Sequence, residues 1–327
     1  RGVSGKGRMG LSRQPGRRVG NLAGPPLMGS SMPAPLFVLT CMRSYSSLVC
    51  AMLGQHPAMY GLPELNLFMA DTLAGVMNKL QIVRPQSLHG LLRVVAQVEY
   101  RAQTTDTVEK ARDWLQRHAH WNAEQFLALL AERTGGSRIM VDKSPSTALN
   151  PANLRRLYRA FPNARFLHLV RHPRATCNSI HQLQQKNAHR RNEHKAVELP
   201  PEQLWSRINS NILAFTGHLP PSQWMLIQGE RLLTQPELYL AQIAGWLGLS
   251  SDAHSMAAML HPEQSPYACI GPPNAPFGND PNFLRNPIYV KRPISPQQLE
   301  GPLEWQQGQR DGFSSSTIAL ARRFGYR

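Results

Sequence analysis

The sequence predicts an α/β protein with a P-loop-like parallel sheet that is flanked by helices on both faces. Three short apolar runs, at residues 36–41, 166–170 and 224–227, have the length and composition of buried strands. Stretches with the apolar spacing of helices separate these runs, and strands that alternate with helices form parallel sheets. Two of the runs pass directly into a turn with a cation and then a helical pattern. Because ligands bind at the carboxyl ends of parallel strands, these two turns are candidate sites.

Helical spacing predicts most of the remaining elements. A first helix follows the first strand and stops before the His-Pro pair at 56–57, since the residue before a proline disfavours helix. A short strand is expected at 138–141, after a Gly-Gly pair. The predicted helices cover residues 46–55, 64–80, 88–100, 108–133, 151–161, 173–184, 201–218, 236–247 and 314–324. Beyond about residue 262 the chain is rich in Pro, Asn and Gly, which predicts a long ordered loop over a site, or a linker.

Composition divides the chain into two parts. Residues 1–33 are rich in Gly, Arg, Ser and Pro, contain six Lys or Arg residues and lack apolar periodicity, so we expect a disordered basic lead. Residues 34–327 are long enough to bury one core, and we expect them to form a single domain.

The net charge of +16 predicts acidic partners, such as phosphorylated cofactors, nucleic acid or an anionic membrane surface. The four cysteines form no Cys-x-x-Cys pair and no zinc-type cluster with histidine, so we expect reduced thiols in a cytoplasmic protein and no metal site. No apolar run reaches the ~18–20 residues that cross a bilayer, so we expect no transmembrane segment.

The turn after the first strand is predicted to bind phosphate or sulfate. It carries one cation, Arg43, and the hydroxyl groups of Ser44, Ser46 and Ser47. Backbone N–H groups without helical partners point outward at a helix N-terminus, and the helix dipole there favours anions.

The second turn has the same character. Arg171 follows the strand at 166–170, Pro173 suits the first helical position, and Ser179 follows Arg171 by eight residues. Arg171 offers a fork of N–H donors for phosphate oxygens, and Ser179 offers a hydroxyl group. An arginine at a strand end is by itself more typical of a surface salt bridge, but its pairing with the first turn favours a second anion site.

Together the two turns resemble the motifs of sulfotransferases that use 3′-phosphoadenosine 5′-phosphosulfate (PAPS) as the sulfuryl donor. Residues 42–47 are similar to the first motif of that family, which binds the 5′-phosphosulfate, and Arg171 with Ser179 is similar to the second, which binds the 3′-phosphate. The resemblance runs from about residue 36 to 249. It implies that PAPS is bound by Arg43, Ser44, Tyr45, Ser46, Ser47, Arg171 and Ser179, without a metal.

A closer resemblance is to bacterial sulfotransferases and to the sulfotransferase domains of polyketide synthases. Segments 141–146, 168–173 and 209–213 are similar to theirs, and so is the Pro-Glu-Leu sequence around Glu64. Protein-tyrosine sulfotransferases share a glutamate near this position. The resemblance implies that Glu64 is the catalytic base, and we place Arg43 and Lys143 near the transferring group. As alternatives, Glu64 is an ordinary helix N-terminal residue and Lys143 a solvent-facing turn residue.

Two positions depart from the family pattern. Tyr45 stands where the usual residue is glycine, and tyrosine rarely adopts the positive φ that glycine tolerates. Gly229 precedes Glu230 where many relatives have an aromatic residue, which puts an aromatic wall for the adenine in doubt there. Relatives close the cofactor site with a late Gly-containing loop, for which residues 278–283 are the candidate.

The resemblance implies transfer of a sulfuryl group from PAPS to a hydroxyl group, or to an amine. A carrier-linked β-hydroxyacyl acceptor and a free small-molecule, carbohydrate, lipid or peptide hydroxyl both stay open. Two other functions were weighed. A kinase-like P-loop enzyme needs Gly-x-x-x-x-Gly-Lys-Ser/Thr after the first strand, which is missing. A basic nucleic-acid-binding protein fits the charge, but no motif for specific nucleic-acid binding is present.

Overall fold

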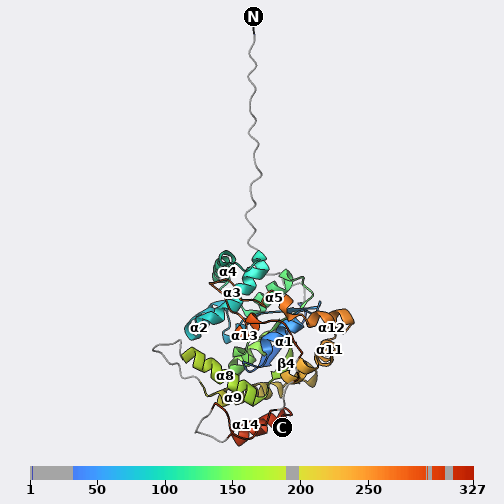
Figure 1. Cartoon of the computed structure of the whole chain (residues 1–327). Helices are drawn as coiled ribbons and strands as arrows, with labels where there is room; N and C mark the ends of the chain where they lie inside the picture. Colours follow the sequence, from blue (N-terminus) through green and yellow to red (C-terminus); the bar gives the residue numbers. More distant parts are fainter. Residues whose placement is uncertain (1, 3–31, 189–198, 292, 294–296, 306–311) are drawn as a thin grey trace.

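The fold is a five-stranded parallel sheet in the order β2-β3-β1-β4-β5, with helices on both faces (Figure 1). The computed structural model describes residues 2, 32–188, 199–291, 293, 297–305 and 312–327. Nearly all of the predicted basic lead lies outside these residues. The strands are β1 (Leu36–Thr40), β2 (Met59–Gly61), β3 (Ile139–Asp142), β4 (Arg165–Val170) and β5 (Trp224–Gln228). The predicted fold class is confirmed.

The helices connect the strands and close the chain. In the first half these are α1 (Ser46–Leu53), α2 (Leu73–Val83), α3 (His89–Tyr100), α4 (Thr105–Arg117), α5 (Ala123–Arg133), α6 (Ser146–Leu149) and α7 (Pro151–Ala160). In the second half these are α8 (Pro173–Ala188), α9 (Pro201–Thr216), α10 (Gly229–Thr234), α11 (Pro236–Trp246), α12 (Ala253–Met259), α13 (Pro281–Arg285) and α14 (Ser315–Arg323). Short 3₁₀ turns cover Leu67–Met69, Pro85–Leu88, Pro221–Gln223 and Pro262–Gln264. None of the described helices is both long and apolar enough to cross a membrane.

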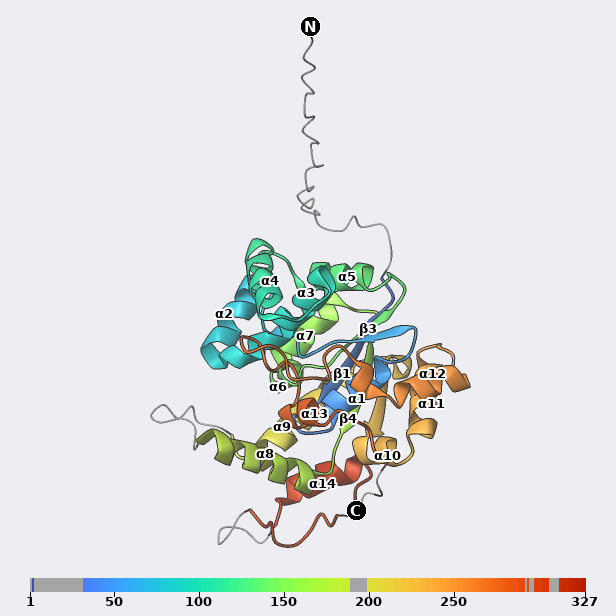
Figure 2. The same ribbon diagram turned by 45° about the horizontal axis from the view of Figure 1, so that its top comes forward.

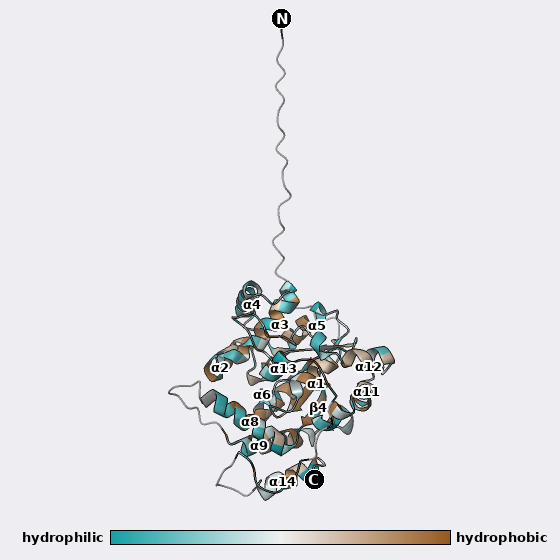
Figure 3. Ribbon diagram, viewed as in Figure 1, coloured by the Kyte–Doolittle hydropathy of each residue, from teal (hydrophilic) through white to brown (hydrophobic). Residues whose placement is uncertain are grey.

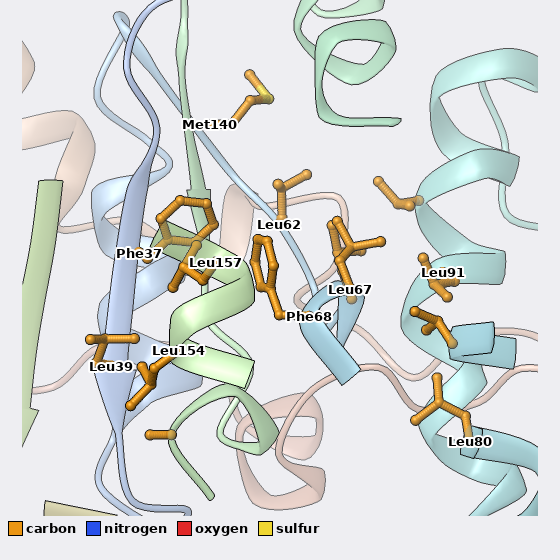
Figure 4. Packing of buried hydrophobic residues seen from close by; sticks show 14 of the residues in the cluster. Phe37, Leu39, Leu62, Leu67, Phe68, Leu80, Leu91, Met140, Leu154 and Leu157 are labelled. Atoms are coloured by element: carbon orange, nitrogen blue, oxygen red, sulfur yellow. The ribbon is translucent and has the colours of Figure 1, made fainter. Parts of the chain in front are cut away.

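Alternate residues of β1 enter two separate cores, because successive side chains of a strand point to opposite faces. Phe37 and Leu39 join the larger core, formed with α2–α5, α7 and α9 (Figure 4). Leu36 and Val38 join the smaller core, formed with α1, α11 and α12. In Figure 3, α1 is largely hydrophobic while α4 and α8 carry many hydrophilic residues. The sheet is therefore buried on both faces, and its strand ends are the places where polar side chains can gather.

Two of the predicted helices were wrong. Residues 64–80 form a loop, a 3₁₀ turn and α2, because Asn66 has a left-handed φ of 56° that no helix continues through. Residues 108–133 form two helices rather than one. Asn122 starts the second, since its side chain and that of Gln125 each accept the other's backbone N–H. The three-residue strand β2 was not predicted from the sequence.

The described part of the Pro-rich late segment before residue 292 packs on the domain as a loop and does not lead away as a linker. Its short helix α13 lies beside α1 in Figures 1 and 2, where Phe283 and Leu284 pack against Ala51. The fully buried Arg93 of α3 holds this segment, donating from Nη1 to the carbonyl oxygen of Phe277 at 2.9 Å. The late loop is thus fixed across the ends of the strands.

Candidate functional site

The predicted site residues converge at the carboxyl ends of four parallel strands. Arg43 follows β1, Lys143 follows β3 and Arg171 follows β4, while Glu64 lies in the loop after β2. Adjacent parallel strands end at the same edge of the sheet, so residues far apart in sequence meet there. Glu64 does not begin a helix, which rules out its alternative interpretation as a helix N-terminal residue.

The first turn folds through two residues with positive φ. Arg43 has φ of 67° and Tyr45 has φ of 63°, so Tyr45 adopts a left-handed backbone conformation of the kind that glycine tolerates and tyrosine rarely adopts. The side chains of Ser44, Ser46 and Ser47 are buried around the N-terminus of α1. Among the described residues, the hydroxyl of Ser44 has no hydrogen-bond partner. The Ser44 hydroxyl is therefore free to donate to a ligand.

The two predicted anion-binding turns touch each other. Arg171 Nη1 donates to the carbonyl oxygen of Arg43 at 2.7 Å, and Arg43 Nε donates to Ser179 Oγ at 2.9 Å. The guanidinium of Arg43 also pairs with the carboxylate of Asp280. The side chain of Arg43 thus lies with the second turn, and no hydrogen bond or ion pair between described residues joins it to Lys143 or Glu64. Arg171 Nε is buried and has no partner within the described chain.

Lys143 is a buried cation and not the solvent-facing turn residue of its alternative interpretation. Its side chain has 0% exposure, and Nζ donates to Glu64 Oε1 at 2.7 Å, Ser47 Oγ at 2.9 Å and Asn279 Oδ1 at 3.1 Å. Glu64 is 32% exposed, so one side of its carboxylate meets the solvent. A buried ammonium group with three oxygen partners has a fixed direction, and here it points at the N-terminus of α1.

A hydroxyl group after β3 fixes the loop that carries Glu64. Ser144 Oγ accepts the backbone N–H groups of Leu65 at 3.1 Å and Asn66 at 3.0 Å, and donates to Asp142 Oδ1 at 3.3 Å. Burial raises the pKa of Asp142 to about 7. Lys143 pairs with Glu64, and its neighbour Asp142 contacts the Glu64 loop indirectly, through Ser144.

The backbone of Glu64 is held on its other side by close packing. Its N–H donates to the carbonyl oxygen of Gly278 at 2.7 Å. A Cβ atom at Gly90 of α3 would lie 2.0 Å from the carbonyl oxygen of Glu64, so only glycine permits this approach. Glu64 is therefore positioned by three separate segments of the chain.

Two late-loop residues complete the site, and neither was predicted to have a role of its own. Asn279 accepts a hydrogen bond from Lys143. Asp280 holds two residues of the first turn, because its backbone N–H donates to Ser47 Oγ at 3.0 Å and its carboxylate pairs with Arg43. They fall within the candidate loop 278–283, but only the packing of that loop brings them to the strand ends. The sequence signal that could have pointed to Asn279 and Asp280 is the run of small and polar residues at 278–282.

The far side of Arg171 is supported by the chain terminus. The backbone N–H of His172 donates to Glu230 Oε1 at 2.8 Å, and the hydroxyl of Tyr326 donates to Glu230 Oε2 at 2.8 Å. Burial lowers the pKa of His172 to about 4, so its imidazole is neutral near pH 7. These contacts fix the start of α8, and therefore the spacing between Arg171 and Ser179.

The assembled site combines the groups of an anion-binding site with a neighbouring carboxylate. Three cationic side chains and a helix N-terminus line it, and the unpartnered donors of Ser44 and Arg171 suit a ligand with phosphate or sulfate oxygens. Glu64 borders the same site, where its carboxylate is paired with Lys143 and its side chain is 32% exposed.

Comparison with known proteins gives a consistent result. A family model described as "Sulfotransferase family" matches residues 35–253. The chain is similar to the solved sulfotransferase domain from the curacin biosynthetic pathway, with a TM-score of 0.71 and 25% identity over 91% of this chain and 99% of that one. It shares the fold of the sulfotransferase domain from the Synechococcus PCC 7002 olefin synthase, with a TM-score of 0.68 and 24% identity over 94% and 99% of the two chains. A comparison with curated protein sequences found no match.

Proposed function

Since the chain belongs to the sulfotransferase family, we propose that it transfers a sulfuryl group from PAPS to the hydroxyl group of an acceptor. The observation that carries this proposal is the contact between the two turns. Arg43 and Arg171 lie side by side, with Arg171 Nη1 2.7 Å from the carbonyl oxygen of Arg43, so one nucleotide can reach both. A ligand with phosphate groups on both the 3′ and 5′ positions of its ribose has the matching chemistry.

Each turn has a part in binding the donor. The N-terminus of α1, with Ser44, Ser46 and Ser47, would hold the 5′-phosphosulfate through backbone N–H and hydroxyl groups. Arg171 and Ser179 would hold the 3′-phosphate. Arg43 lies between the two and would neutralise charge on either side, and Tyr45 provides part of the wall.

Lys143 and Glu64 would act at the transferring group. The donor supplies an activated sulfuryl group, whose bond to the phosphate oxygen breaks as a new S–O bond forms to the acceptor oxygen. Glu64 would accept the proton that the hydroxyl group loses. Lys143, whose Nζ lies 2.9 Å from Ser47 Oγ, would stabilise the negative charge left on the phosphate oxygen. As in phosphoryl transfer, positioning and electrostatics then supply most of the rate enhancement.

The acceptor is inferred from the exposure of Glu64. The partly exposed Glu64 implies that the acceptor reaches its carboxylate from the solvent side. A hydroxyl group is the expected acceptor, and an amine is the alternative. A carrier-linked β-hydroxyacyl chain fits the similarity to a domain of a biosynthetic pathway, while a free small molecule fits the open carboxylate equally well.

Thermal unfolding with different ligands tests the proposal. We expect adenosine 3′,5′-bisphosphate to raise the melting temperature by several degrees at a concentration well above its Kd, because it binds the folded state alone. ATP with Mg²⁺ and a short DNA duplex at matched concentration should raise it far less. A larger shift with ATP–Mg²⁺ would favour a kinase-like enzyme, and a larger shift with DNA would favour a nucleic-acid-binding protein.

A further inference from the structure

The two departures from the family pattern lie against each other in space. Tyr45 stands in the turn after β1, and Gly229 begins α10 directly after β5. A Cβ atom on Gly229 would lie 2.9 Å from the ring atom Cδ2 of Tyr45, closer than real Cβ atoms approach other atoms. The ring of Tyr45 therefore occupies the space into which a side chain at residue 229 would project.

The same ring stacks on the candidate ligand of the 3′-phosphate. The guanidinium carbon of Arg171 lies 4.2 Å from the centroid of the Tyr45 ring, the geometry of a cation–π contact. This contact fixes the guanidinium plane. Nη1 donates to the carbonyl oxygen of Arg43, but Nε has no partner among the described residues and stays available to an anion. Two other aromatic side chains nearby are committed elsewhere: buried Trp205 donates to the carbonyl oxygen of Arg171, and buried Tyr326 donates to Glu230. Tyr45 is only half-buried, so part of its ring is open to a ligand.

We infer that Tyr45 is the aromatic contact for the nucleobase of the donor, and that Gly229 is the complementary residue that leaves room for its ring. This inference rests on the proposed function. The base of the donor is joined to the ribose that carries the 3′-phosphate, so a base bound beside Arg171 lies within reach of the Tyr45 ring. In this chain the aromatic surface comes from the first turn instead of the end of β5.

Exchange of the two side chains tests the inference. The variants are Tyr45→Leu, Gly229→Tyr and the double variant Tyr45→Gly/Gly229→Tyr. Each is titrated by calorimetry with adenosine 3′,5′-bisphosphate and with the 3,5-bisphosphate of 1,2-dideoxyribose, which has both phosphates but no base. Melting temperatures verify that each protein is folded. Leucine was chosen at position 45 because an apolar side chain there helps to keep the turn packed.

Loss of stacking should weaken binding of the adenine ligand by roughly 5- to 100-fold in Tyr45→Leu, with a much smaller effect on the ligand without a base. Gly229→Tyr should weaken both ligands, because its side chain displaces the Tyr45 ring from Arg171. The double variant should recover the preference for the adenine ligand. If Tyr45→Leu kept the wild-type ratio of the two affinities, whether or not both affinities fell, the base contact would be overturned. If the double variant showed no stronger preference for the adenine ligand than Gly229→Tyr does, the claim that residues 45 and 229 share one space would be wrong.

The same titrations distinguish failure of the proposed function from failure of the Tyr45 inference. Arg171→Ala should lose affinity for both ligands whether or not Tyr45 contacts the base. If the folded wild-type protein bound neither ligand, the proposed function itself would be wrong, and the inference with it. Binding of both ligands without dependence on Tyr45 would leave the proposed function standing and remove the inference alone.

Discussion

Replacement of Glu64 by glutamine is expected to lower kcat by about 10²- to 10⁴-fold, the usual contribution of a general base. Glutamine keeps the size of the side chain and one oxygen for the 2.7 Å contact from Lys143, but it cannot accept the acceptor proton. Affinity for adenosine 3′,5′-bisphosphate should stay within about twofold, since both phosphate-binding turns are intact. The measurement pairs initial rates, with labelled donor sulfate read by mass spectrometry, and a binding titration.

Glu99→Gln is the matched control. Glu99 is also a partly buried carboxylate paired with a cation, since it accepts from Arg133 Nε at 2.9 Å, but it lies outside the site. The control should retain wild-type kcat. If Glu64→Gln kept full turnover, another group must take the proton and the assignment of the base would be wrong.

Replacement of Lys143 by methionine is expected to lower kcat by about 10²- to 10³-fold, as seen when one charge-stabilising donor is removed from an active site. Methionine fills much of the volume of the buried stem without an ammonium group. The protein should remain folded, because Glu64 is 32% exposed and stays hydrated without its partner. Calorimetry and initial rates on the same preparation separate loss of charge stabilisation from loss of fold.

Lys110→Met provides the comparison for this variant. Lys110 pairs with Asp106 at 2.7 Å, the same distance as the Lys143–Glu64 pair, but its side chain is 54% exposed on α4. The Lys110→Met substitution should leave kcat unchanged. A Lys143→Met enzyme with the kcat of Lys110→Met would remove Lys143 from the catalytic assignment.

The strand ends could be predicted from sequence because their signals are local. An apolar run followed by a polar turn and a helical pattern placed Arg43 and Arg171 at the edge of one sheet. The parallel topology puts both turns at the same edge of the sheet, and the pairing of β1 with β4 brings them into contact. Even the placement of Glu64 after a short loop follows from this logic, although the helix predicted to begin there was wrong.

The rest of the site depends on packing that no local pattern records. Lys143 has no sequence signal for complete burial, because the three oxygens around it come from α1, the Glu64 loop and the late loop. Asp280 reaches Arg43 only because buried Arg93 holds the late loop on α3. The departures at Tyr45 and Gly229 were visible in the sequence, but their contact was not, since 184 positions separate them and the strands between them must first pair.

A structure of the protein crystallised with adenosine 3′,5′-bisphosphate tests the central claim most directly, namely that both turns bind one nucleotide. The 3′-phosphate should lie within hydrogen-bond distance of Arg171 and Ser179, and the 5′-phosphate should lie on the N-terminus of α1 near Ser47. A nucleotide that contacts one turn only, or that binds elsewhere on the molecule, would contradict the account.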